Sequence, residues 1–316
     1  MPDINELIEK YKNWDSKYKS LVTLIVLIFI TFLFITGTTA GLLPLFILVL
    51  VPIYMKRMKL KDEMQKNFKE NDLQKILQEA FPGATYDSEG SAIDAEGCRR
   101  CNLFPIKKNM CLTEDGVQMR FGRNDDISLD YVEVYTYEIK SDSDGAHYKS
   151  TLFKGGLFKY TFFKKFKDNI YIIPNEVVNG KVKHGLLGGD KPVHNPTKLE
   201  KNLTEVSLED VEFNELFSVY SNNEAETFYI LTPQYMSLIK ELYRKYGSNI
   251  RFKFSDNYMY IAINDMDLFD FKPVFDKLCQ VDHAKSFDAC VAQTKEEIKS
   301  LVDFAEKLEL GDSIFA

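Results

Sequence analysis

The stretch Ser20–Met55, SLVTLIVLIFITFLFITGTTAGLLPLFILVLVPIYM, contains no charged residue and is flanked by Lys19 and Lys56. A membrane-spanning helix needs about 20 apolar residues, so this run is too long for one helix and close to the length of two. Its middle, Gly37–Gly41, has the composition of a turn. The stretch therefore predicts a transmembrane helical hairpin over residues 20–57.

Basic residues at both ends of this run predict its orientation. They are Lys10, Lys12, Lys17 and Lys19 before it, and Lys56, Arg57, Lys59 and Lys61 after it. Because the cytoplasmic flanks of membrane helices are rich in Lys and Arg, both termini and the main domain are predicted to be cytoplasmic, with a lipid bilayer as a partner. A single span and a buried hairpin in the core of a soluble protein are the alternatives.

Two helices are predicted to flank the hairpin. Residues 1–19 carry apolar side chains at a spacing of three to four, which is typical of an amphipathic cytosolic helix. Residues 58–81 carry a broken apolar stripe that stops at Pro82-Gly83. This second segment is predicted to be a stalk helix.

The remaining chain is predicted to form two cytosolic subdomains, a β-rich one over residues 84–178 and an α+β one over residues 203–316. Between them, Asn179–Asn202 is a long irregular segment with four glycines and two prolines. A loop of this length is typical of a boundary or a functional loop. The predicted fold class is α+β, with an N-terminal transmembrane helical hairpin, a helical stalk and a mainly antiparallel β cytosolic domain whose helices include a long C-terminal helix.

Composition narrows the classes of function. The chain has 316 residues and a formal net charge of −7, which argues against nucleic acid as a partner. Its five cysteines are an odd number, which in a domain facing the cytosol predicts reduced thiols.

Alternating apolar residues predict strands from Ile127 to Ile139 and over Tyr148–Phe153. A further strand over Leu157–Phe166 is predicted to pair with Ile170–Ile173 as a hairpin. Gly155-Gly156 separates the two middle strands, and a bulge or tight turn is favoured there over a phosphate-binding loop.

Capping residues mark the clearest helix of the chain. Thr232 precedes Pro233 and an apolar stripe, and Gly247 follows, which predicts a helix between them. Ile250–Ile263 then alternates about Asp256-Asn257, which predicts a β-hairpin with a central return strand.

Three cysteines are the candidate metal ligands. Cys98 and Cys101 have the spacing of half a zinc site, and Cys111 with a histidine is the candidate second half. The histidines considered are His147, His184 and His194. A redox pair and ordinary partly buried thiols are the alternatives.

Two acidic or glycine-rich segments are weaker candidates. Asp265, Asp267 and Asp270 lie close together, as in Ca²⁺ or Mg²⁺ sites, but the pattern of an EF-hand loop is absent and a solvated loop is favoured. Gly188-Gly189-Asp190 beside Lys191 has the composition of an anion nest, although a plain turn is favoured.

The C-terminal helix carries a regular apolar stripe at alternating spacings of four and three. Its residues are Phe287, Val291, Thr294, Ile298, Leu301, Ala305 and Leu308. The stripe predicts either a coiled-coil seam for self-association or packing against the protein's own sheet or stalk helix.

Three segments resemble a known family. They are Phe153–Pro174 (FKGGLFKYTFFKKFKDNIYIIP), Val206–Thr232 (VSLEDVEFNELFSVYSNNEAETFYILT) and the paired strands of Ile250–Ile263. The chain resembles an uncharacterised family of bacterial two-helix membrane proteins with a cytosolic domain of unknown function, number three-one-three-seven in that series. The resemblance implies a location in the bacterial inner membrane, as a multi-pass protein, and brings no catalytic residues with it.

The predicted function is a non-enzymatic, membrane-anchored cytosolic interaction or sensing module of unknown ligand, because no catalytic or cofactor-binding motif stands out and no cofactor is expected. A protein partner, or self-association through the C-terminal helix, is expected. One alternative is a metal-assisted hydrolase using the 184–194 loop, in which His184, His194 and Asp190 converge. Another is a lipid- or peptide-binding β-sheet domain at the membrane. Its pocket would be lined by Phe158, Tyr160 and Phe162.

Overall fold

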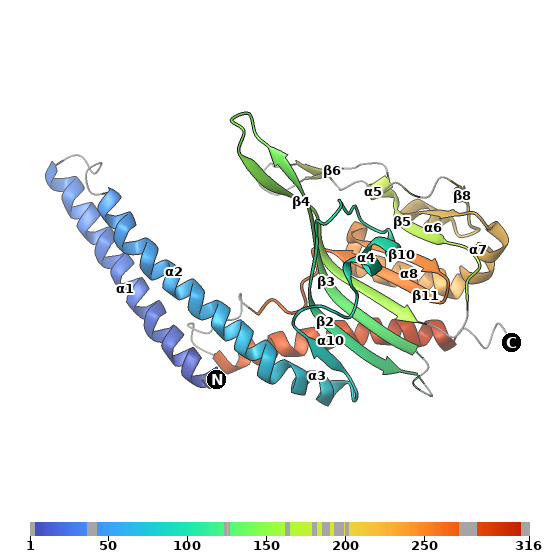
Figure 1. Ribbon diagram of the computed structural model, residues 1–316, viewed down its shortest axis with the longest axis horizontal. Helices are drawn as coiled ribbons and strands as arrows, with labels where there is room; N and C mark the ends of the chain where they lie inside the picture. The colour runs from blue at the N-terminus through green and yellow to red at the C-terminus, as the bar shows by residue number, and fades with distance from the viewer. Residues whose placement is uncertain are drawn as a thin grey trace. The chain divides into compact units, whose positions relative to one another are not determined.

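The computed structural model describes residues 4–36, 43–122, 125, 127–161, 165–178, 182–184, 190–192, 199, 202–271 and 283–310. The chain is α+β, with a large antiparallel sheet and helices (Figure 1). It divides into two compact units. One comprises Met1–Ile76 and Phe269–Glu296, and the other comprises Leu77–Leu268 and Glu297–Ala316.

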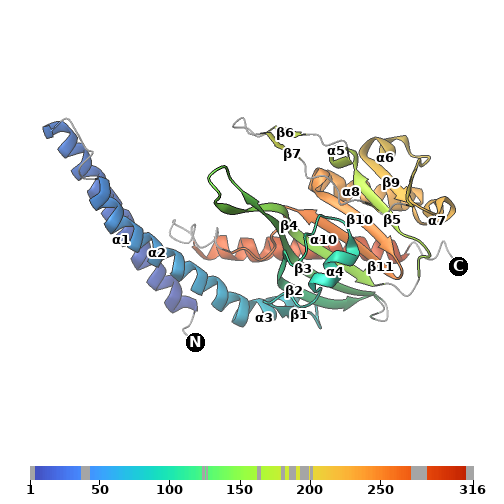
Figure 2. The same cartoon turned by 45° about the horizontal axis from the view of Figure 1, so that its top comes forward.

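Helices dominate the first unit. Helix α1 (Ile4–Thr36) and helix α2 (Leu43–Phe68) lie side by side in both ribbon views (Figures 1 and 2). A π-helical turn, η1 (Lys69–Leu73), joins α2 to α3 (Gln74–Ala80). The helical run therefore ends just before Pro82-Gly83, as the sequence predicts.

The prediction of a transmembrane hairpin is wrong for this structure. In the part of the chain that the structure describes, no helix combines the length and the apolar character needed to cross a bilayer. The physical reason is that the uncharged run is divided between two helices. Ser20–Thr36 belongs to α1 and Leu43–Met55 to α2, and each piece is shorter than the roughly 20 residues that a span needs.

The second unit is built on a sheet of nine strands among the described residues, in the order β1-β2-β3-β4-β11-β10-β5-β9-β8. Each neighbouring pair is antiparallel, as predicted. The strands are β1 (Thr85–Asp87), β2 (Cys111–Phe121), β3 (Ile127–Ser141), β4 (His147–Thr161), β5 (Ile170–Pro174), β8 (Thr204–Val206), β9 (Phe217–Ser221), β10 (Ile250–Ser255) and β11 (Tyr258–Asn264).

Both faces of the central strands are buried. Helix α4 (Ala95–Cys101) packs on one face, in a core that includes Val132, Leu157 and Tyr171. On the other face, the Tyr160 hydroxyl donates to the Leu301 carbonyl of α10 (His283–Leu310) at 3.1 Å. Alternate residues of a central strand therefore pack into the cores on the two opposite faces of the sheet, because successive side chains of a strand point to opposite faces.

Shorter elements complete the second unit. They are α5 (Asn175–Val178), α6 (Val211–Leu216), α7 (Glu224–Ile230), α8 (Pro233–Tyr246) and the 3-10 turn η2 (Gly247–Asn249), with β6 (Val182–His184) and β7 (Asp190–Pro192) forming a separate two-stranded sheet. The predicted caps are confirmed. Thr232 accepts from the Tyr235 N–H, and Gly247 ends α8 with a positive φ of 59°.

Two strand predictions need correction. Gly155-Gly156 does not interrupt a strand, since β4 continues through it and pairs with β3 and β11 on its two sides. The expected hairpin between Leu157–Phe166 and Ile170–Ile173 is also absent from the described sheet. The β10–β11 hairpin lies between β4 and β5, so strands that are neighbours in sequence are separated in the sheet.

The apolar stripe of the C-terminal helix is buried where it meets the sheet. Ile298, Leu301 and Ala305 are at most 3% exposed, and the Phe304 ring lies 6.3 Å from the Phe252 ring. Packing against the protein's own sheet therefore accounts for this part of the stripe.

Candidate functional site

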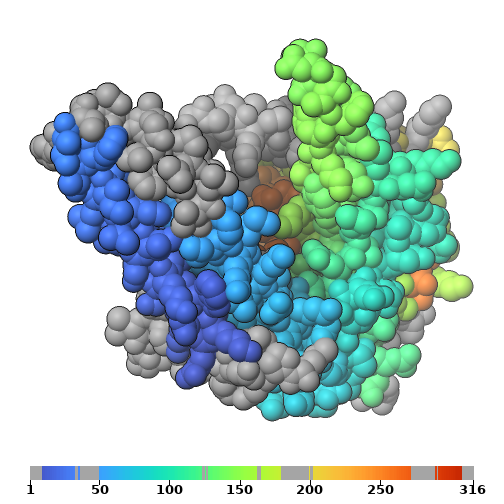
Figure 3. Space-filling view, turned by 60° about the vertical axis from the view of Figure 1, so that its left-hand side comes forward, coloured from blue at the N-terminus to red at the C-terminus, as the bar shows by residue number. Residues whose placement is uncertain are grey.

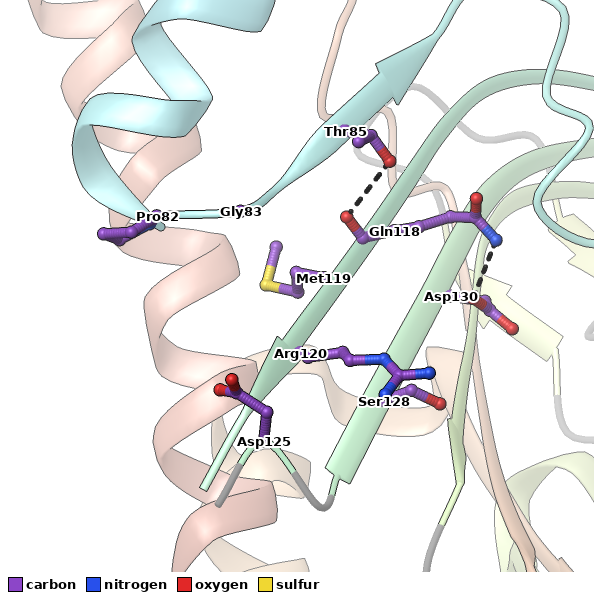
Figure 4. A pocket seen from close by; sticks show the side chains of 9 residues that line it. All are labelled: Pro82, Gly83, Thr85, Gln118, Met119, Arg120, Asp125, Ser128 and Asp130. Atoms are coloured by element: carbon purple, nitrogen blue, oxygen red, sulfur yellow. Dashed lines mark hydrogen bonds between the residues drawn. The ribbon is translucent and has the colours of Figure 1, made fainter. Parts of the chain in front are cut away.

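A polar cavity of about 470 Å³ lies beside the first three strands of the sheet (Figure 4). Its walls come from the turn after α3 and from β1, β2 and β3. The lining residues are Pro82, Gly83, Thr85, Gln118, Met119, Arg120, Asp125, Ser128 and Asp130. Cavities of this size are typical of small-ligand sites.

Sheet register brings the polar side chains of the cavity together. Gln118 lies opposite Asp130, and Asp130 lies opposite Lys159. The Gln118 Nε2 donates to Asp130 Oδ1 at 3.1 Å, and Lys159 Nζ lies 3.4 Å from Asp130 Oδ2. Both carboxylate oxygens of Asp130 therefore already have partners, which fixes this wall of the cavity.

Arg120 is the distinctive cation of the cavity. It is exposed, lies opposite Ser128 across β2–β3, and extends toward that side chain in Figure 4. Among the described residues it makes neither a hydrogen bond nor an ion pair. A guanidinium suits a carboxylate or phosphate group, which it can bind through two parallel hydrogen bonds.

The sequence patterns considered above do not predict this site, although the sequence carries a signal for it. Gln118 and Arg120 alternate with the buried Val117 and Met119, which is the pattern of a half-buried strand with a polar outer row. Asp115-Gly116 interrupts the pattern, which makes it hard to recognise in the sequence. The β2–β3 register shifts between Glu114 and Val117 at that point.

The three candidate cysteines lie in the same part of the core. Cys98 and Cys101 belong to α4 and are fully buried, and Cys111, at the start of β2, packs against the same core cluster. The Cys101 thiol donates to the Cys98 carbonyl at 3.0 Å. Over the residues that are placed, no group of three or more His, Cys, Asp or Glu side chains is arranged to hold a metal ion.

The histidines supply no second half of a zinc site in the described chain. The His147 Nδ1 lies 2.8 Å from Ser141 Oγ near the end of the β3–β4 arm (residues 137–151), which projects from the sheet (Figure 3). His194 and the His184 side chain lie outside the described residues, as do most of the 184–194 loop and Gly188-Gly189. The hydrolase alternative therefore has no described geometry.

The acidic segment after β11 is a loop with conventional contacts. Asp265 and Asp267 are exposed, and Asp267 Oδ2 lies 3.6 Å from Lys154 Nζ. The Asp265 N–H donates to the Lys154 carbonyl at 2.8 Å. This agrees with a solvated loop rather than a cation site.

The aromatic residues expected to line a lipid or peptide pocket are packed in the core. Phe158 is 1% exposed, with its ring 4.5 Å from that of Tyr131, and Tyr160 is completely buried. Phe162 lies outside the described residues. Neither Phe158 nor Tyr160 lines the polar cavity.

The first unit has a different kind of surface. Large apolar side chains of α1 and α2 are exposed. They are Leu24, Val26, Leu27, Ile28, Ile30, Ile35, Val51, Tyr54 and Met55.

Comparison with known proteins identifies one family. A family model described as "Protein of unknown function (DUF3137)" matches residues 151–310. All three segments that carry the sequence resemblance lie within this range, so the resemblance is confirmed. No curated protein gave a significant match.

One solved structure has a weak likeness to the chain. It is the crystal structure of the mycobacterial trehalose monomycolate transport factor A, TtfA. The alignment has 7% sequence identity and a TM-score of 0.32, and it covers 73% of this chain and 96% of that one. A likeness at this level carries no argument about fold or function.

Proposed function

The chain belongs to the DUF3137 family of proteins of unknown function, and on that premise we propose that it is a non-enzymatic interaction module attached to a lipid bilayer. The first unit provides the attachment through the exposed apolar side chains of α1 and α2. The sheet of the second unit presents the polar cavity at Arg120 to a partner. The proposed location is the cytoplasmic side of the bacterial inner membrane.

The observation that carries the proposal is the exposed apolar surface of the helical pair. Leu27 is 57% exposed and Ile35 is 77% exposed, although both are strongly apolar. Burying apolar surface is favourable by roughly 25 cal/mol per Å² removed from water. Burial of these side chains against another apolar surface is therefore strongly favoured. Large patches of this kind mark membrane or protein contacts.

Charge beside the patch favours lipid as the cover. The uncharged run is bordered by the exposed Lys17 and Lys19 on α1 and by the exposed Lys56 on α2. Basic residues at the edge of an apolar surface attract the anionic headgroups of a bilayer, at about 1 kcal/mol per residue near the surface. A protein partner would have no general need for this basic border.

The cavity is proposed to receive an anionic group of the partner. Arg120 supplies the positive charge, and the neighbouring Gln118 and Ser128 supply polar groups that fix orientation. The described site pairs no nucleophile with a general base, so binding is the function that its chemistry supports best.

Flotation of the purified chain with vesicles of phosphatidylglycerol and phosphatidylethanolamine tests the attachment. The wild type should rise with the vesicles. A Leu27→Glu/Ile28→Glu variant should remain at the bottom of the gradient, whereas Lys149→Glu on the β3–β4 arm should float like the wild type. Circular dichroism of each variant checks that its helices are formed. Flotation of the double variant at the wild-type level would contradict the proposal.

Titration with inorganic phosphate and with acetate tests the cavity. Chemical shifts of amides around Arg120 should move in a saturable way in the wild type and should not move in Arg120→Gln. Arg244→Gln is the matched control, because Arg244 is an exposed arginine on α8, away from the cavity lining. Equal shifts in wild type and Arg120→Gln would exclude Arg120 as the anion-binding group.

A further inference from the structure

The β3–β4 arm extends beyond the strands that flank β3 and β4 in the sheet (Figure 3). The ladder between β2 and β3 ends where Cys111 lies opposite Thr136, and the ladder between β11 and β4 ends at Gly155. In the described part of the chain, the arm therefore has no strand beside it on either edge. A two-stranded hairpin alone is only marginally stable in water, so a further strand at one edge would stabilise the arm.

The outer edge of β3 in the arm presents the backbone of Ile139. The Tyr137 N–H donates to the Met110 carbonyl at 3.3 Å, so the backbone of Tyr137 faces the side of β2. Backbone groups of alternate residues point to the same edge, so the N–H and C=O of Ile139 face this edge as well. At the tip, the Asp142 N–H donates to the Ala146 carbonyl inside the hairpin, which gives the same alternation. An edge with open hydrogen-bonding groups is a template for pairing with another chain.

The side chains on this edge suit a contact with another strand. Ile139 is 54% exposed although it is apolar. Glu138 and Lys140 lie on the opposite face of the strand from Ile139, because side chains alternate along a strand. Their side chains form an ion pair at 3.0 Å and are 27% and 49% exposed. A pair as exposed as this contributes little, so exchanging it for an equivalent pair costs little.

We propose that the arm is a self-association surface, on which β3 pairs antiparallel with β3 of a second copy of this chain, centred on Ile139. In this register Ile139 of one copy lies opposite Ile139 of the other. Glu138 of each copy then lies opposite Lys140 of the other, which places two pairs of opposite charges directly across the strands. Opposite charges at such positions stabilise a sheet, and the same edge serves both copies, as a two-fold interface requires.

The other edge of the arm has no such self-complementarity. Residues 147–154 of β4 contain Lys149 and Lys154 but no carboxylate. Pairing of this edge with its own copy would bring no opposite charges together. Charge therefore favours the β3 edge as the contact.

The edge from Tyr137 to Ser141 is short, so the dimer is expected to be weak. Stable complexes bury about 1,200 Å² or more in total, and smaller interfaces are typical of transient association. The contact uses residues other than the exposed apolar side chains of α1 and α2 and the lining of the Arg120 cavity, so it depends on neither.

Sedimentation equilibrium of the full chain in a density-matched detergent tests the proposal, because the detergent covers the apolar surface of α1 and α2. The wild type should show a monomer–dimer equilibrium. Glu138→Lys would place cations opposite each other and Lys140→Glu would place carboxylates opposite each other. Each variant alone should weaken the dimer by about tenfold or more. An equimolar mixture of the two should dimerise like the wild type, because a basic edge then meets an acidic one.

Two further variants separate backbone pairing from a general effect of charge. Ile139→Pro removes an N–H that points away from β4, so it should abolish the dimer while the arm keeps its own ladder. Glu209→Lys makes the same change of charge at an exposed residue outside the arm and should dimerise like the wild type.

Three results would overturn the assignment. They are a wild type that stays monomeric up to near-millimolar concentration, reversal variants that dimerise as well as the wild type, and a mixture that fails to restore the dimer. A dimer that is lost in Leu27→Glu/Ile28→Glu but kept in both reversal variants would place self-association on the helices instead. The mixture needs no comparison with a destabilised variant, since each reversal variant serves as the control for the other.

Discussion

Arg251 on β10 donates a hydrogen bond from Nη1 to the backbone carbonyl of Leu103 at 2.7 Å, across 148 positions of sequence. Two residues along the same strand, Lys253 Nζ donates to the Arg100 carbonyl at 2.9 Å. Both cations are 4% exposed. The last carbonyls of a helix lack partners within the helix and attract positive charge. Arg100 lies in the last turn of α4 and Leu103 lies just beyond the helix, so β10 holds the C-terminal end of α4 and the segment that follows it through these two side chains.

Replacing Arg251 with Met should destabilise the protein by about 1.5–3 kcal/mol, because the buried Leu103 carbonyl loses a charged donor. Urea unfolding followed by circular dichroism measures the change. Arg244→Met is the matched control, and since Arg244 is 64% exposed, its effect should stay within about 0.5 kcal/mol. An Arg251→Met variant as stable as the wild type would show that the cation does not stabilise α4.

Gly155 should tolerate no side chain, unlike its neighbour Gly156. A Cβ at Gly155 would lie 2.1 Å from the Ile263 carbonyl oxygen, and backbone of β11 cannot move aside without breaking the sheet. A Cβ at Gly156 would meet the Tyr131 ring at 2.8 Å, and that side chain can shift. Overpacking typically destabilises a protein by roughly 1–3 kcal/mol. Gly155→Ala should therefore lower the free energy of unfolding by about 3 kcal/mol or more, and Gly156→Ala should lower it clearly less. Equal unfolding midpoints would contradict this reading of the contact.

These glycines illustrate how much of the fold could be predicted from the sequence. Alternation and capping are local signals, and they gave β3, α8 and the β10–β11 hairpin correctly. Gly155-Gly156 resembles an interruption in the sequence because the reason for these glycines, the close approach of β11, comes from residues distant in the chain. The strand order could not be predicted for the same reason. No local sequence pattern indicates that β10 and β11 lie between β4 and β5.

The candidate site was harder to predict than the fold. Helix α4 has only seven residues, and its start depends on the Asp94 side chain accepting from the Gly97 N–H at 2.7 Å. Strand β2 follows it with polar residues and an irregular register, so the whole segment has the sequence pattern of a loop. The C-x-x-C spacing marked Cys98 and Cys101, but it could not show that Cys111 packs against the same core, because that contact depends on the docking of α4 against β2.

Tyr160 should make stability depend on alkaline pH. Burial raises the pKa of its hydroxyl well above the usual value, and its O–H donates to the Leu301 carbonyl. Its contribution to the stability of the folded state is fully present below about pH 10. This contribution is lost as the pH rises further, because the unfolded chain then releases a proton that the folded chain retains. Tyr160→Phe should lower stability at pH 7 by about 0.5–1.5 kcal/mol and should flatten the alkaline loss by up to about 1.4 kcal/mol per pH unit.

Unfolding curves collected from pH 8 to about pH 11 separate these two effects of Tyr160. Tyr148→Phe is the matched control, since Tyr148 is 51% exposed and should change neither the stability at pH 7 nor its pH dependence appreciably. A Tyr160→Phe variant whose alkaline profile runs parallel to that of the wild type would exclude the buried hydroxyl as a source of the pH dependence.

Asp15 should be the electrostatic link between α1 and α2. Its carboxylate is 3% exposed and lies 2.7 Å from Arg57 Nε and 2.7 Å from Lys19 Nζ, but Arg57 is only 17% exposed whereas Lys19 is 58% exposed. Removing one partner of a buried ion pair leaves the other charge without compensation. Asp15→Ala should therefore destabilise the packing of α1 against α2 by about 3 kcal/mol or more. Lys19→Gln should cost at most about 1 kcal/mol, because an exposed ion pair is screened by water. Amide hydrogen exchange across α1 and α2 measures both, and faster exchange in Lys19→Gln than in Asp15→Ala would reverse the assigned roles.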